Sequence, residues 1–501
     1  FLLLLCCSLA ACAETASVTL LVTTDLHGNI LPYDYFTARP AERGLAKVAT
    51  LIRQERQRDP QALLIDCGDT IQGSPLESVF QQYTRTGSLP AGMRYSGRVP
   101  EAEPMMLTMS RLGFDAMVVG NHEYNFGIGN FEKARKDARF PWISANTMTP
   151  ASMKPLAPYF VKALPNGVKV AIIGITTPAV PSWEKAEHIR GLRFLSGVDA
   201  TRKAIAALRA SEKPDVVIVA AHAGLDRDLR TGEIRSGESG FENMVWQIAQ
   251  QVEGVDAIVF GHTHQQLEQQ MVNGVLLHQP KNWGISLGRV EFQLERPGAG
   301  DRWQVKAKTG KLLPVTKEVP VDAEIAALAK PYHELTEAWL KTPVAQSPAD
   351  LDASLSRVRD TALVDAIHQV QLAESKADVS LTAMFNPRAR FPKGPVTVRQ
   401  VAALYIYDNE LYVIEGNGRM LREALENAAR YFLSCPTAAC EGPLTNRKVI
   451  GFNYDMAQGV EYTIDLTRAE GSRIVNLKYR GKPLADDQPL RIAVNNYRAG
   501  G

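Results

Sequence analysis

Long runs of charge of either sign are missing from this sequence of 501 residues. Its 56 lysines and arginines nearly balance its 54 aspartates and glutamates, which leaves a formal net charge of +2. Extended nucleic-acid binding needs clustered positive charge, so the composition argues against a polymeric nucleic acid as partner. The sequence also shows no internal repeat and no low-complexity tract. We therefore expect a small-molecule substrate and, at this length, two or more globular domains.

Apolar runs long enough to span a bilayer are also missing. Residues 1–13 form an apolar stretch that is too short to cross a membrane and that ends in small residues, as a secretory signal does. The stretch begins without Met or a basic residue, so we expect the natural chain to start upstream. Leu-Ala-Ala-Cys at residues 9–12 resembles the bacterial lipobox, which implies a lipid on Cys12. The alternative is an ordinary signal with an incidental cysteine. We expect a periplasmic protein of a Gram-negative bacterium that touches the membrane only through this lipid.

Cysteine is scarce, with six residues in the chain. Cys435 and Cys440 lie five positions apart in a Pro-containing segment and could close a small disulfide in an oxidising compartment. A loop this short gains modest stability from such a bond. We expect Cys67 to be a small buried residue.

Polar residues gather instead in five short clusters within the first 264 positions. Each cluster follows an apolar run rich in β-branched residues, which predicts that it lies at the end of a buried strand. Ligands in open α/β sheets gather at the carboxyl ends of strands. Mixed Asp, Asn and His ligands suit divalent ions, and one carboxylate can bridge two of them. The residues are Asp25 and His27 in T-T-D-L-H-G-N, Asp69 in D-C-G-D-T, Asn121 and His122 in V-V-G-N-H-E, His222 in A-A-H-A-G, and His262 and His264 in F-G-H-T-H.

The order of these clusters resembles the signature of the calcineurin-like metallophosphoesterases. Residues 68–76, G-D-T-I-Q-G-S-P-L, are similar to the branch of periplasmic 5′-nucleotidases and 2′,3′-cyclic-nucleotide 2′-phosphodiesterase/3′-nucleotidases. The resemblance implies an α/β protein with a four-layer αββα metallophosphoesterase domain, a linking helix and a smaller, truncated α/β nucleotide-specificity domain. The expected bounds are 1–16 for the signal segment and tether, 17–318 for the first domain, 319–342 for the linking helix and 343–501 for the second domain.

The same resemblance implies two bound divalent ions, whose identity among Mn, Zn, Co, Mg and Ca the sequence leaves open. Asp69 would bridge the two ions, and His122 would be a catalytic histidine beside them rather than a ligand. The reaction would be hydrolysis of a phosphoester by a dimetal-activated hydroxide. The implied ligands are Asp25, His27, Asp69 and His264 for one ion, and Asp69, Asn121, His222 and His262 for the other.

One position in the G-N-H-E cluster separates two branches of the family. True 5′-nucleotidases typically continue as G-N-H-E-F-D, where the Asp pairs with the catalytic His, whereas this chain has Asn125 in that place. Asn can accept a hydrogen bond from imidazole but brings no charge. This version resembles the cyclic phosphodiesterase branch, as do residues 25–35 and 241–243. We therefore expect hydrolysis of 2′,3′-cyclic nucleotides to 3′-nucleotides, and of 3′-nucleotides to nucleosides and phosphate, with His122 and Asn125 as catalytic residues.

Fragments of the second domain resemble the family's nucleotide-specificity domain. Asn386, Arg388 and Arg390 lie where related nucleotidases contact substrate, although N-P-R-A-R replaces a glycine-rich run and leaves open which arginine acts. Tyr407 aligns with a base-stacking aromatic, which would accept any base. Ordinary surface arginines and a packed core tyrosine are the alternatives. A second stacking residue is expected beyond Gly501.

Other functions remain open at this point. The nearest alternative is a 5′-nucleotidase or nucleotide-sugar hydrolase on the same scaffold. More remote are a thiosulfohydrolase and a surface-binding lipoprotein with a vestigial metal site. We expect a monomer, and we expect His188, His333 and His368 at the surface because they lie in charged or helical surroundings.

Overall fold

The computed structural model describes residues 13–234, 240–298, 300–404, 410–435, 440 and 444–499. Cys12 and Tyr407 lie outside these ranges, so lipidation of Cys12 and base stacking by Tyr407 stay predictions. The chain divides into two compact units, Phe1–Trp339 and Leu340–Gly501. Helix α7 (Ala323–Leu340) reaches this division and occupies most of the segment in which a linking helix is predicted.

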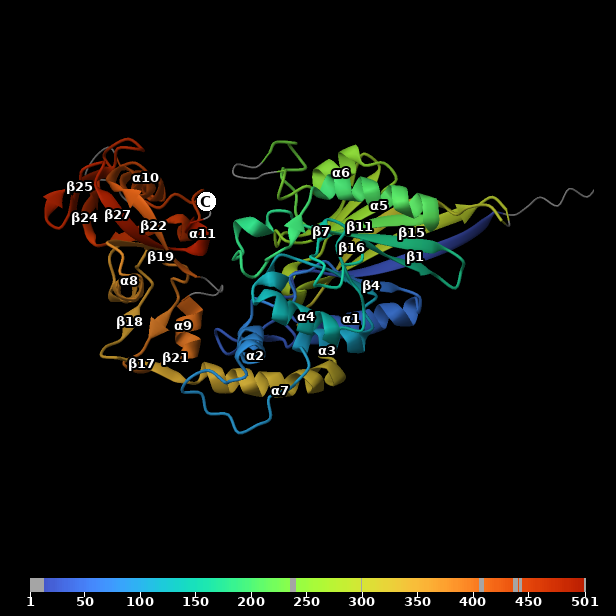
Figure 1. The fold of residues 1–501 in the computed structure, drawn as a ribbon, viewed down its shortest axis with the longest axis horizontal. Helices are drawn as coiled ribbons and strands as arrows, with labels where there is room; N and C mark the ends of the chain where they lie inside the picture. Colours follow the sequence, from blue (N-terminus) through green and yellow to red (C-terminus); the bar gives the residue numbers. More distant parts are fainter. Residues whose placement is uncertain are drawn as a thin grey trace, which may run out of the picture. The chain divides into compact units, whose positions relative to one another are not determined.

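Two six-stranded sheets form the centre of the first unit (Figure 1). The first sheet runs in the order β16 (Gln304–Pro314), β15 (Ser286–Arg296), β1 (Glu14–Thr23), β4 (Leu63–Asp66), β5 (Ala116–Val118) and β6 (Trp142–Ile143). The second runs in the order β13 (Leu267–Val272), β14 (Val275–Gln279), β12 (Ala257–Phe260), β11 (Val216–His222), β9 (Lys169–Thr176) and β8 (Tyr159–Ala163). Strands β1, β4 and β5 are parallel to one another, as are β9, β11 and β12. Each set therefore brings its carboxyl ends to one edge of its sheet.

Strand β11 illustrates why the sequences of these strands are continuous apolar runs. Its residues Val216, Ile218 and Ala220 belong to the core between the two sheets. Val217 and Val219 face the opposite side, where α5 (Gly197–Ser211) and α6 (Val245–Gln251) complete a second core. Successive side chains of a strand point to opposite faces, and both faces are buried here, so both must be apolar.

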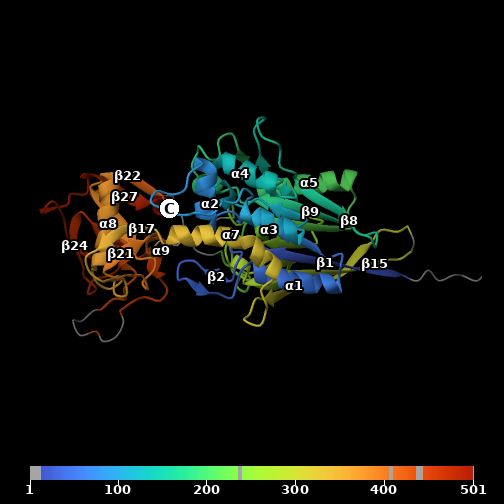
Figure 2. The same ribbon diagram turned by 90° about the horizontal axis from the view of Figure 1, so that it is seen from below.

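Helices also cover the outer face of the first sheet, which completes four layers in the order helix, sheet, sheet, helix (Figures 1 and 2). These helices are α1 (Leu45–Arg58), α2 (Pro75–Thr86), α3 (Pro104–Leu112) and α4 (Gly127–Asp137). The αββα prediction for the first domain is confirmed. The layering follows from strands that are apolar on both faces, each of which must be covered.

The second unit is a smaller α/β body around a four-stranded sheet. The sheet runs in the order β22 (Leu411–Asn417), β27 (Pro489–Asn495), β19 (Val379–Ala383) and β23 (Asp455–Gln458). Helix α8 (Ala362–Ser375) contributes Leu363 and Val364 to one core, and α10 (Gly418–Ala429) contributes Leu421 and Leu425 to another. The remaining described elements include α9 (Val398–Leu404) and a three-stranded sheet of β24 (Val460–Ile464), β25 (Ile474–Tyr479) and β26 (Lys482–Pro483).

The surface prediction for one of the three outlying histidines is wrong. His368 is buried on α8, and its Nδ1 lies 2.9 Å from the Ser380 hydroxyl. Burial lowers the pKa of His368 to about 4, so the imidazole packs as a neutral group. His188 and His333 are half-buried and have polar partners in the first unit. Helical periodicity alone did not distinguish the packed face of α8 from its exposed face, because the helix is apolar on much of its circumference.

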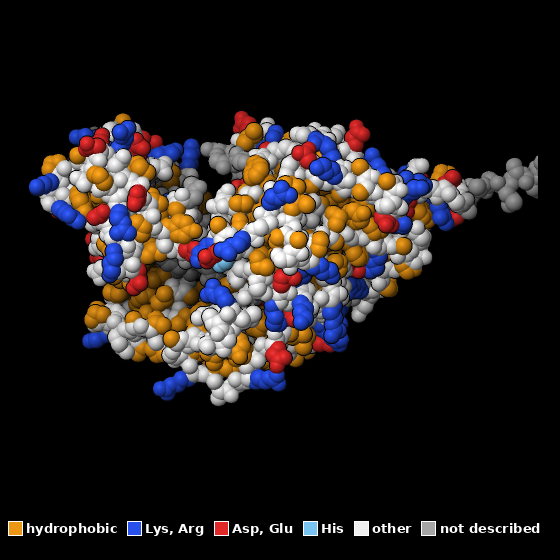
Figure 3. Space-filling model, in the orientation of Figure 1, with side chains coloured by type: hydrophobic (Ala, Val, Ile, Leu, Met, Phe, Trp, Pro, Cys, Tyr) orange, Lys and Arg blue, Asp and Glu red, His pale blue; other side chains and the backbone are white. Residues whose placement is uncertain are grey.

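The state of the cysteines and the distribution of surface charge agree with what the sequence indicates. A disulfide joins Cys435 and Cys440, whose Cα atoms are 5.9 Å apart, and Cys67 is buried. No helix in the described part of the chain has both the length and the apolar character needed to cross a bilayer. Basic and acidic side chains are interspersed on the face shown in Figure 3 rather than gathered by sign.

Candidate metal centre

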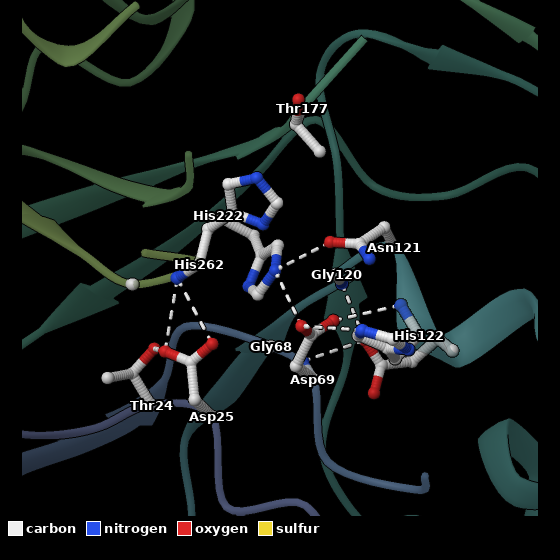
Figure 4. Close-up of polar contacts among 12 residues, drawn as sticks. Thr24, Asp25, Gly68, Asp69, Gly120, Asn121, His122, Thr177, His222 and His262 are labelled. Carbon is white, nitrogen blue, oxygen red and sulfur yellow. Dashed lines mark hydrogen bonds and ion pairs between the residues drawn. The ribbon is translucent and has the colours of Figure 1, made fainter. Parts of the chain in front are cut away.

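The five polar clusters meet at the carboxyl ends of strands from both sheets. Asp25 follows β1, Asp69 follows β4 and Asn121 follows β5 in the first sheet. His222 is the last residue of β11 and His262 follows β12 in the second sheet. Figure 4 shows the side chains of Asp69, Asn121 and His222 pointing toward one another, although they are far apart in the sequence. The facing strand ends of two sheets therefore build one polar centre.

Donor atoms at this centre form two groups that could each hold a metal ion. In each group the donor atoms lie within 4.8 Å of one another. Oδ2 of Asp69 lies 3.0 Å from Nε2 of His222 and 3.9 Å from Nε2 of His27, so it stands between the groups as a bridging carboxylate must. Oδ1 of Asn121 lies 3.0 Å from the same His222 nitrogen. The two groups are Asp25, His27 and His264, and Asp69, His222 and His262.

Backbone carbonyls determine which nitrogen two of the histidines offer. Nδ1 of His27 lies 2.7 Å from the carbonyl oxygen of Gln72, and Nδ1 of His222 lies 2.8 Å from that of Cys67. A carbonyl oxygen only accepts, so Nδ1 carries the hydrogen in both rings and Nε2 is the nitrogen left for an ion. Metal-binding histidines are commonly oriented in this way. The donor types and their orientation fit two divalent ions.

His262 receives its orienting contact from a carboxylate. Its Nε2 lies 2.9 Å from Oε1 of Glu242, and its backbone N–H donates to both carboxylate oxygens of Asp25 at 3.1 Å. Nδ1 is therefore the nitrogen of His262 that is left for an ion. Glu242 belongs to residues 241–243, which we quoted for their resemblance to the cyclic branch, but the sequence did not suggest this contact.

The charges at the centre favour a cation between Asp69 and His222. Burial alone raises the pKa of Asp69, but the charges of His222 and His122 outweigh it and hold this pKa well below its usual range. Burial alone lowers the pKa of His222, whereas the charge of Asp69 and the hydrogen bond to it raise the pKa to about 10. The negative charge of Asp69 therefore favours a proton at Nε2 of His222, the position that a metal ion would take instead.

Five of the predicted ligands have a left-handed backbone conformation, which is uncommon for residues other than glycine. The D-x-H loop is held in this conformation by the next cluster, since the backbone N–H groups of Asp25 and His27 donate to the carbonyl oxygens of Gly68 and Asp69, both at 2.9 Å. Backbone conformations of this kind concentrate at functional sites. The φ angles are 50° at Asp25, 47° at His27, 59° at Asp69, 71° at His262 and 53° at His264.

Glycine is required beside two of these ligands because the backbones approach so closely. A Cβ atom on Gly120 would lie 2.3 Å from Oδ1 of Asp69. Gly68 has a φ of +93°, and a Cβ atom there would lie 2.7 Å from the backbone nitrogen of Gly120. The G-D and G-N-H-E clusters therefore need their glycines so that Asp69 can reach the centre.

The side chain of Glu123 supports the loops that carry the predicted ligands. The sequence pattern assigned no role to this residue. Its carboxylate accepts backbone N–H groups from Gly120 at 2.6 Å, Asp69 at 2.9 Å and Thr70 at 2.6 Å. Burial raises the pKa of Glu123. The only sequence signal is its place directly after Asn121 and His122, which does not distinguish a support from a surface residue.

We expect Glu123→Gln to weaken metal binding about 10- to 100-fold, the usual effect of losing a group that orients ligands. Glutamine has one acceptor oxygen where four backbone N–H donors converge, and its amide would face them with further donors. Competition with a metal-binding dye measures the affinity. Glu132→Gln on α4 is the matched control, because Glu132 is partly exposed and pairs only with Arg135 at 3.3 Å among the described residues. Unchanged affinity in Glu123→Gln would contradict the supporting role.

His122 lies beside the two groups and belongs to neither of them. Its backbone N–H donates to Oδ1 of Asp69 at 2.9 Å, and its Nε2 lies 3.9 Å from Oδ2 of the same residue. Its Nδ1 lies 2.5 Å from Oδ1 of Asn125, so the predicted pair is formed. The geometry directs Nε2 of His122 toward the centre, where it can contact a reacting phosphate.

The three predicted substrate-binding residues of the second unit differ in whether their side chains already have polar partners. Asn386 donates its side-chain N–H to the carbonyl of Ala403 at 2.8 Å, and Arg390 pairs with Asp352 at 2.8 Å. Arg388 is exposed and its backbone N–H donates to Oδ1 of Asn386 at 3.0 Å, while no partner of its guanidinium is found within the described residues. Arg388 therefore has the less engaged guanidinium of the two arginines, and the roles of all three residues stay predictions.

Comparisons with known proteins agree with both units. Residues 18–266 match the calcineurin-like phosphoesterase family, and residues 341–501 match the 5′-nucleotidase C-terminal domain. The chain is 29% identical to the trifunctional nucleotide phosphoesterase protein YfkN of Bacillus subtilis over 98% of its length, although it spans only 36% of that protein. It is 28% identical to the 2′,3′-cyclic-nucleotide 2′-phosphodiesterase/3′-nucleotidase of Salmonella typhimurium, over 98% of this chain and 82% of that one.

A solved structure supports the same architecture. The structure of a candidate 5′-nucleotidase from Staphylococcus aureus is 27% identical and superposes with a TM-score of 0.79 over 97% of this chain and 91% of that one. The two family matches, the two-unit fold and the paired donor groups point to one conclusion. The chain belongs to the calcineurin-like phosphoesterases and carries the C-terminal domain of the 5′-nucleotidases.

Proposed function

We propose that this chain hydrolyses 2′,3′-cyclic nucleotides to 3′-nucleotides, and 3′-nucleotides to nucleosides and phosphate. The observation that carries the proposal is the 2.5 Å contact between Nδ1 of His122 and Oδ1 of Asn125. An uncharged partner for this histidine resembles the cyclic branch, whereas the 5′-nucleotidase pattern has an Asp in this place. The Salmonella relative named for these two activities, 28% identical over nearly the whole chain, supports the assignment.

The side chains divide the work at the centre. Two bound divalent ions would lower the pKa of a water and clamp the phosphate oxygens. Asp69 places a negative charge between the two donor groups, and His27 and His222 present Nε2 because backbone carbonyls hold their Nδ1 atoms. His122 presents its Nε2 to the phosphate. With a hydrogen on both ring nitrogens, it can donate from Nε2 to an equatorial oxygen or hand that proton to the leaving oxygen. The uncharged Asn125 holds that ring in place.

Comparing substrates tests the proposal. We expect kcat/KM for 2′,3′-cyclic AMP and for 3′-AMP to exceed that for 5′-AMP, with release of phosphate from the cyclic substrate only after 3′-AMP has formed. Chromatography of the products over time follows both steps, and the Asp69→Asn variant serves as the blank. A preference for 5′-AMP would reject the assignment.

A second candidate is 5′-nucleotidase or nucleotide-sugar hydrolysis on the same scaffold. It is favoured by the similarity to the Staphylococcus aureus protein, at a TM-score of 0.79. The same assay separates the two, provided that UDP-glucose is included. Hydrolysis of 5′-AMP or UDP-glucose ahead of the cyclic substrate would support this candidate instead.

A further inference from the structure

A row of hydrogen-bonded side chains extends from His122 away from the metal centre. Nδ1 of His122 lies 2.5 Å from Oδ1 of Asn125, whose amide nitrogen donates to Oε2 of Glu184 at 2.6 Å. The other carboxylate oxygen of Glu184 lies 2.8 Å from Nδ1 of His188 and accepts the backbone N–H of Lys185 at 2.8 Å. Glu184 follows the short helix η2 (Val180–Ser182), far in the sequence from the G-N-H-E cluster. Nothing in the sequence pattern assigns it a role.

The carboxylate of Glu184 is enclosed and well supplied with donors. Its side chain is 6% exposed and that of His188 is 14% exposed. The three contacts come from Asn125, Lys185 and His188. A buried carboxylate with this many donors is held in one position, so it can determine the orientation of the side chains that donate to it.

The direction of each hydrogen bond follows from the chemistry of Glu184. An ionised carboxylate only accepts, so Asn125 must present its NH₂ group to Glu184 and its carbonyl oxygen to His122. The carbonyl oxygen also only accepts, so Nδ1 of His122 must carry a hydrogen. Without Glu184 the amide of Asn125 could turn over and present NH₂ to the imidazole. Nδ1 would then accept from that NH₂ group, so the ring would keep a single hydrogen, on Nε2, and would be a much weaker proton donor than a ring with a hydrogen on both nitrogens.

We propose that Glu184 is a positioning residue that orients the amide of Asn125 and thereby holds His122 in the form with a hydrogen on Nδ1. The proposal rests on phosphoester hydrolysis at the metal centre and not on which nucleotide is preferred. In the 5′-nucleotidase pattern a carboxylate contacts the histidine directly. In this chain a neutral amide takes that place, and the carboxylate stands one residue further from the ring.

The first test is Glu184→Gln, measured with bis-p-nitrophenyl phosphate and with 2′,3′-cyclic AMP. A glutamine can present either its oxygen or its NH₂ group to Asn125, so the orientation of the amide is no longer imposed. We expect kcat to fall about 10- to 100-fold, the usual scale for an orienting partner, while KM and bound metal stay unchanged. Glu187→Gln is the matched control, because Glu187 is three residues further on, 66% exposed and 3.9 Å from His188. This control should keep wild-type kinetics.

The second test exchanges the two groups. Asn125→Asp alone places two carboxylates where the structure has a 2.6 Å hydrogen bond, so we expect it to lower kcat as well. The double variant Asn125→Asp with Glu184→Gln restores every hydrogen-bond direction, because the new carboxylate accepts from His122 and the new amide donates to it. We expect its kcat to exceed that of either single variant, with a coupling of about two- to 150-fold between the two substitutions. If the two substitutions only caused independent structural defects, their losses of kcat would be additive in the double variant.

Nitrogen NMR of the metal-free protein labelled with ¹⁵N-histidine gives a readout besides activity. We expect the hydrogen of His122 on Nδ1 in the wild type and in the double variant, and a mixture of tautomers in Glu184→Gln. Full kcat in Glu184→Gln, a double variant no better than the worse single one, or loss of metal in Glu184→Gln would each overturn the proposal. Wild type that hydrolyses bis-p-nitrophenyl phosphate but neither cyclic nor 3′-nucleotides would overturn the proposed function, while the exchange measured on that ester would still test Glu184.

Discussion

Asp69→Asn should remove nearly all hydrolysis while leaving the fold intact. Oδ2 of Asp69 stands between the two donor groups, 3.0 Å from His222 and 3.9 Å from His27, so the change removes a negative charge from both. Each bound ion contributes several kcal/mol to transition-state stabilisation, and about 1.4 kcal/mol is tenfold in rate. We therefore expect kcat to fall by about 10³-fold or more. Bound metal, measured by mass spectrometry, should fall below two ions per chain.

The fold should survive this substitution because the backbone of the loop around Asp69 donates to Glu123, and because an asparagine oxygen can still accept the backbone N–H of His122. Circular dichroism and thermal unfolding check this point. Asp199→Asn is the matched control for loss of one carboxylate, since Asp199 is 62% exposed at the start of α5. Near-normal turnover of Asp69→Asn with saturating Mn²⁺ or Co²⁺ would show that Asp69 does not bridge the ions.

His122→Ala has the second large expected effect, a loss of kcat of about 10²- to 10⁴-fold, the usual scale for a positioned acid or base. His122 lies outside both donor groups and is held by Asn125, so its loss should leave both ions bound. The measurement is kcat together with metal content on the same preparation. KM for bis-p-nitrophenyl phosphate should change little, because the side chain acts on the transition state.

Metal content decides between the two roles that His122 could have. A variant that retains two ions and loses turnover supports a catalytic histidine. A drop to one ion would make His122 a ligand. His122 would then have to be added to one of the two groups of three donors.

The layered fold and the meeting of the five clusters could be predicted because each strand carries its own signal. Val216–Ala220 is apolar at every position, which predicts a strand buried on both faces, and the polar residue at its end marks the edge of the sheet. The same reasoning applies at β1, β4, β5 and β12. Local sequence therefore placed His222 and its counterparts at strand ends before any packing was known.

Contacts between distant segments could not be predicted in this way. Glu123, Glu184 and Glu242 lie in polar stretches of the sequence. Glutamate is a common residue on a solvated surface, so the residue type alone did not indicate a buried role. Each becomes informative only when packing excludes water and places a particular donor opposite it, as backbone amides meet Glu123 and the Asn125 amide meets Glu184. His368 was misplaced for a similar reason, since its hydrogen-bond partner, Ser380, comes from a different element.

By itself the sequence determined which residues meet at the centre, because residue type and strand-end position are both local properties. Only the tertiary structure decided how those residues are oriented. The tautomers of His27 and His222 and the direction of the Asn125 amide all depend on carbonyl and carboxylate groups from other segments. Hydrogen bonds are directional over about 3 Å, so the orientation of a side chain is fixed by whichever group the fold brings within that distance.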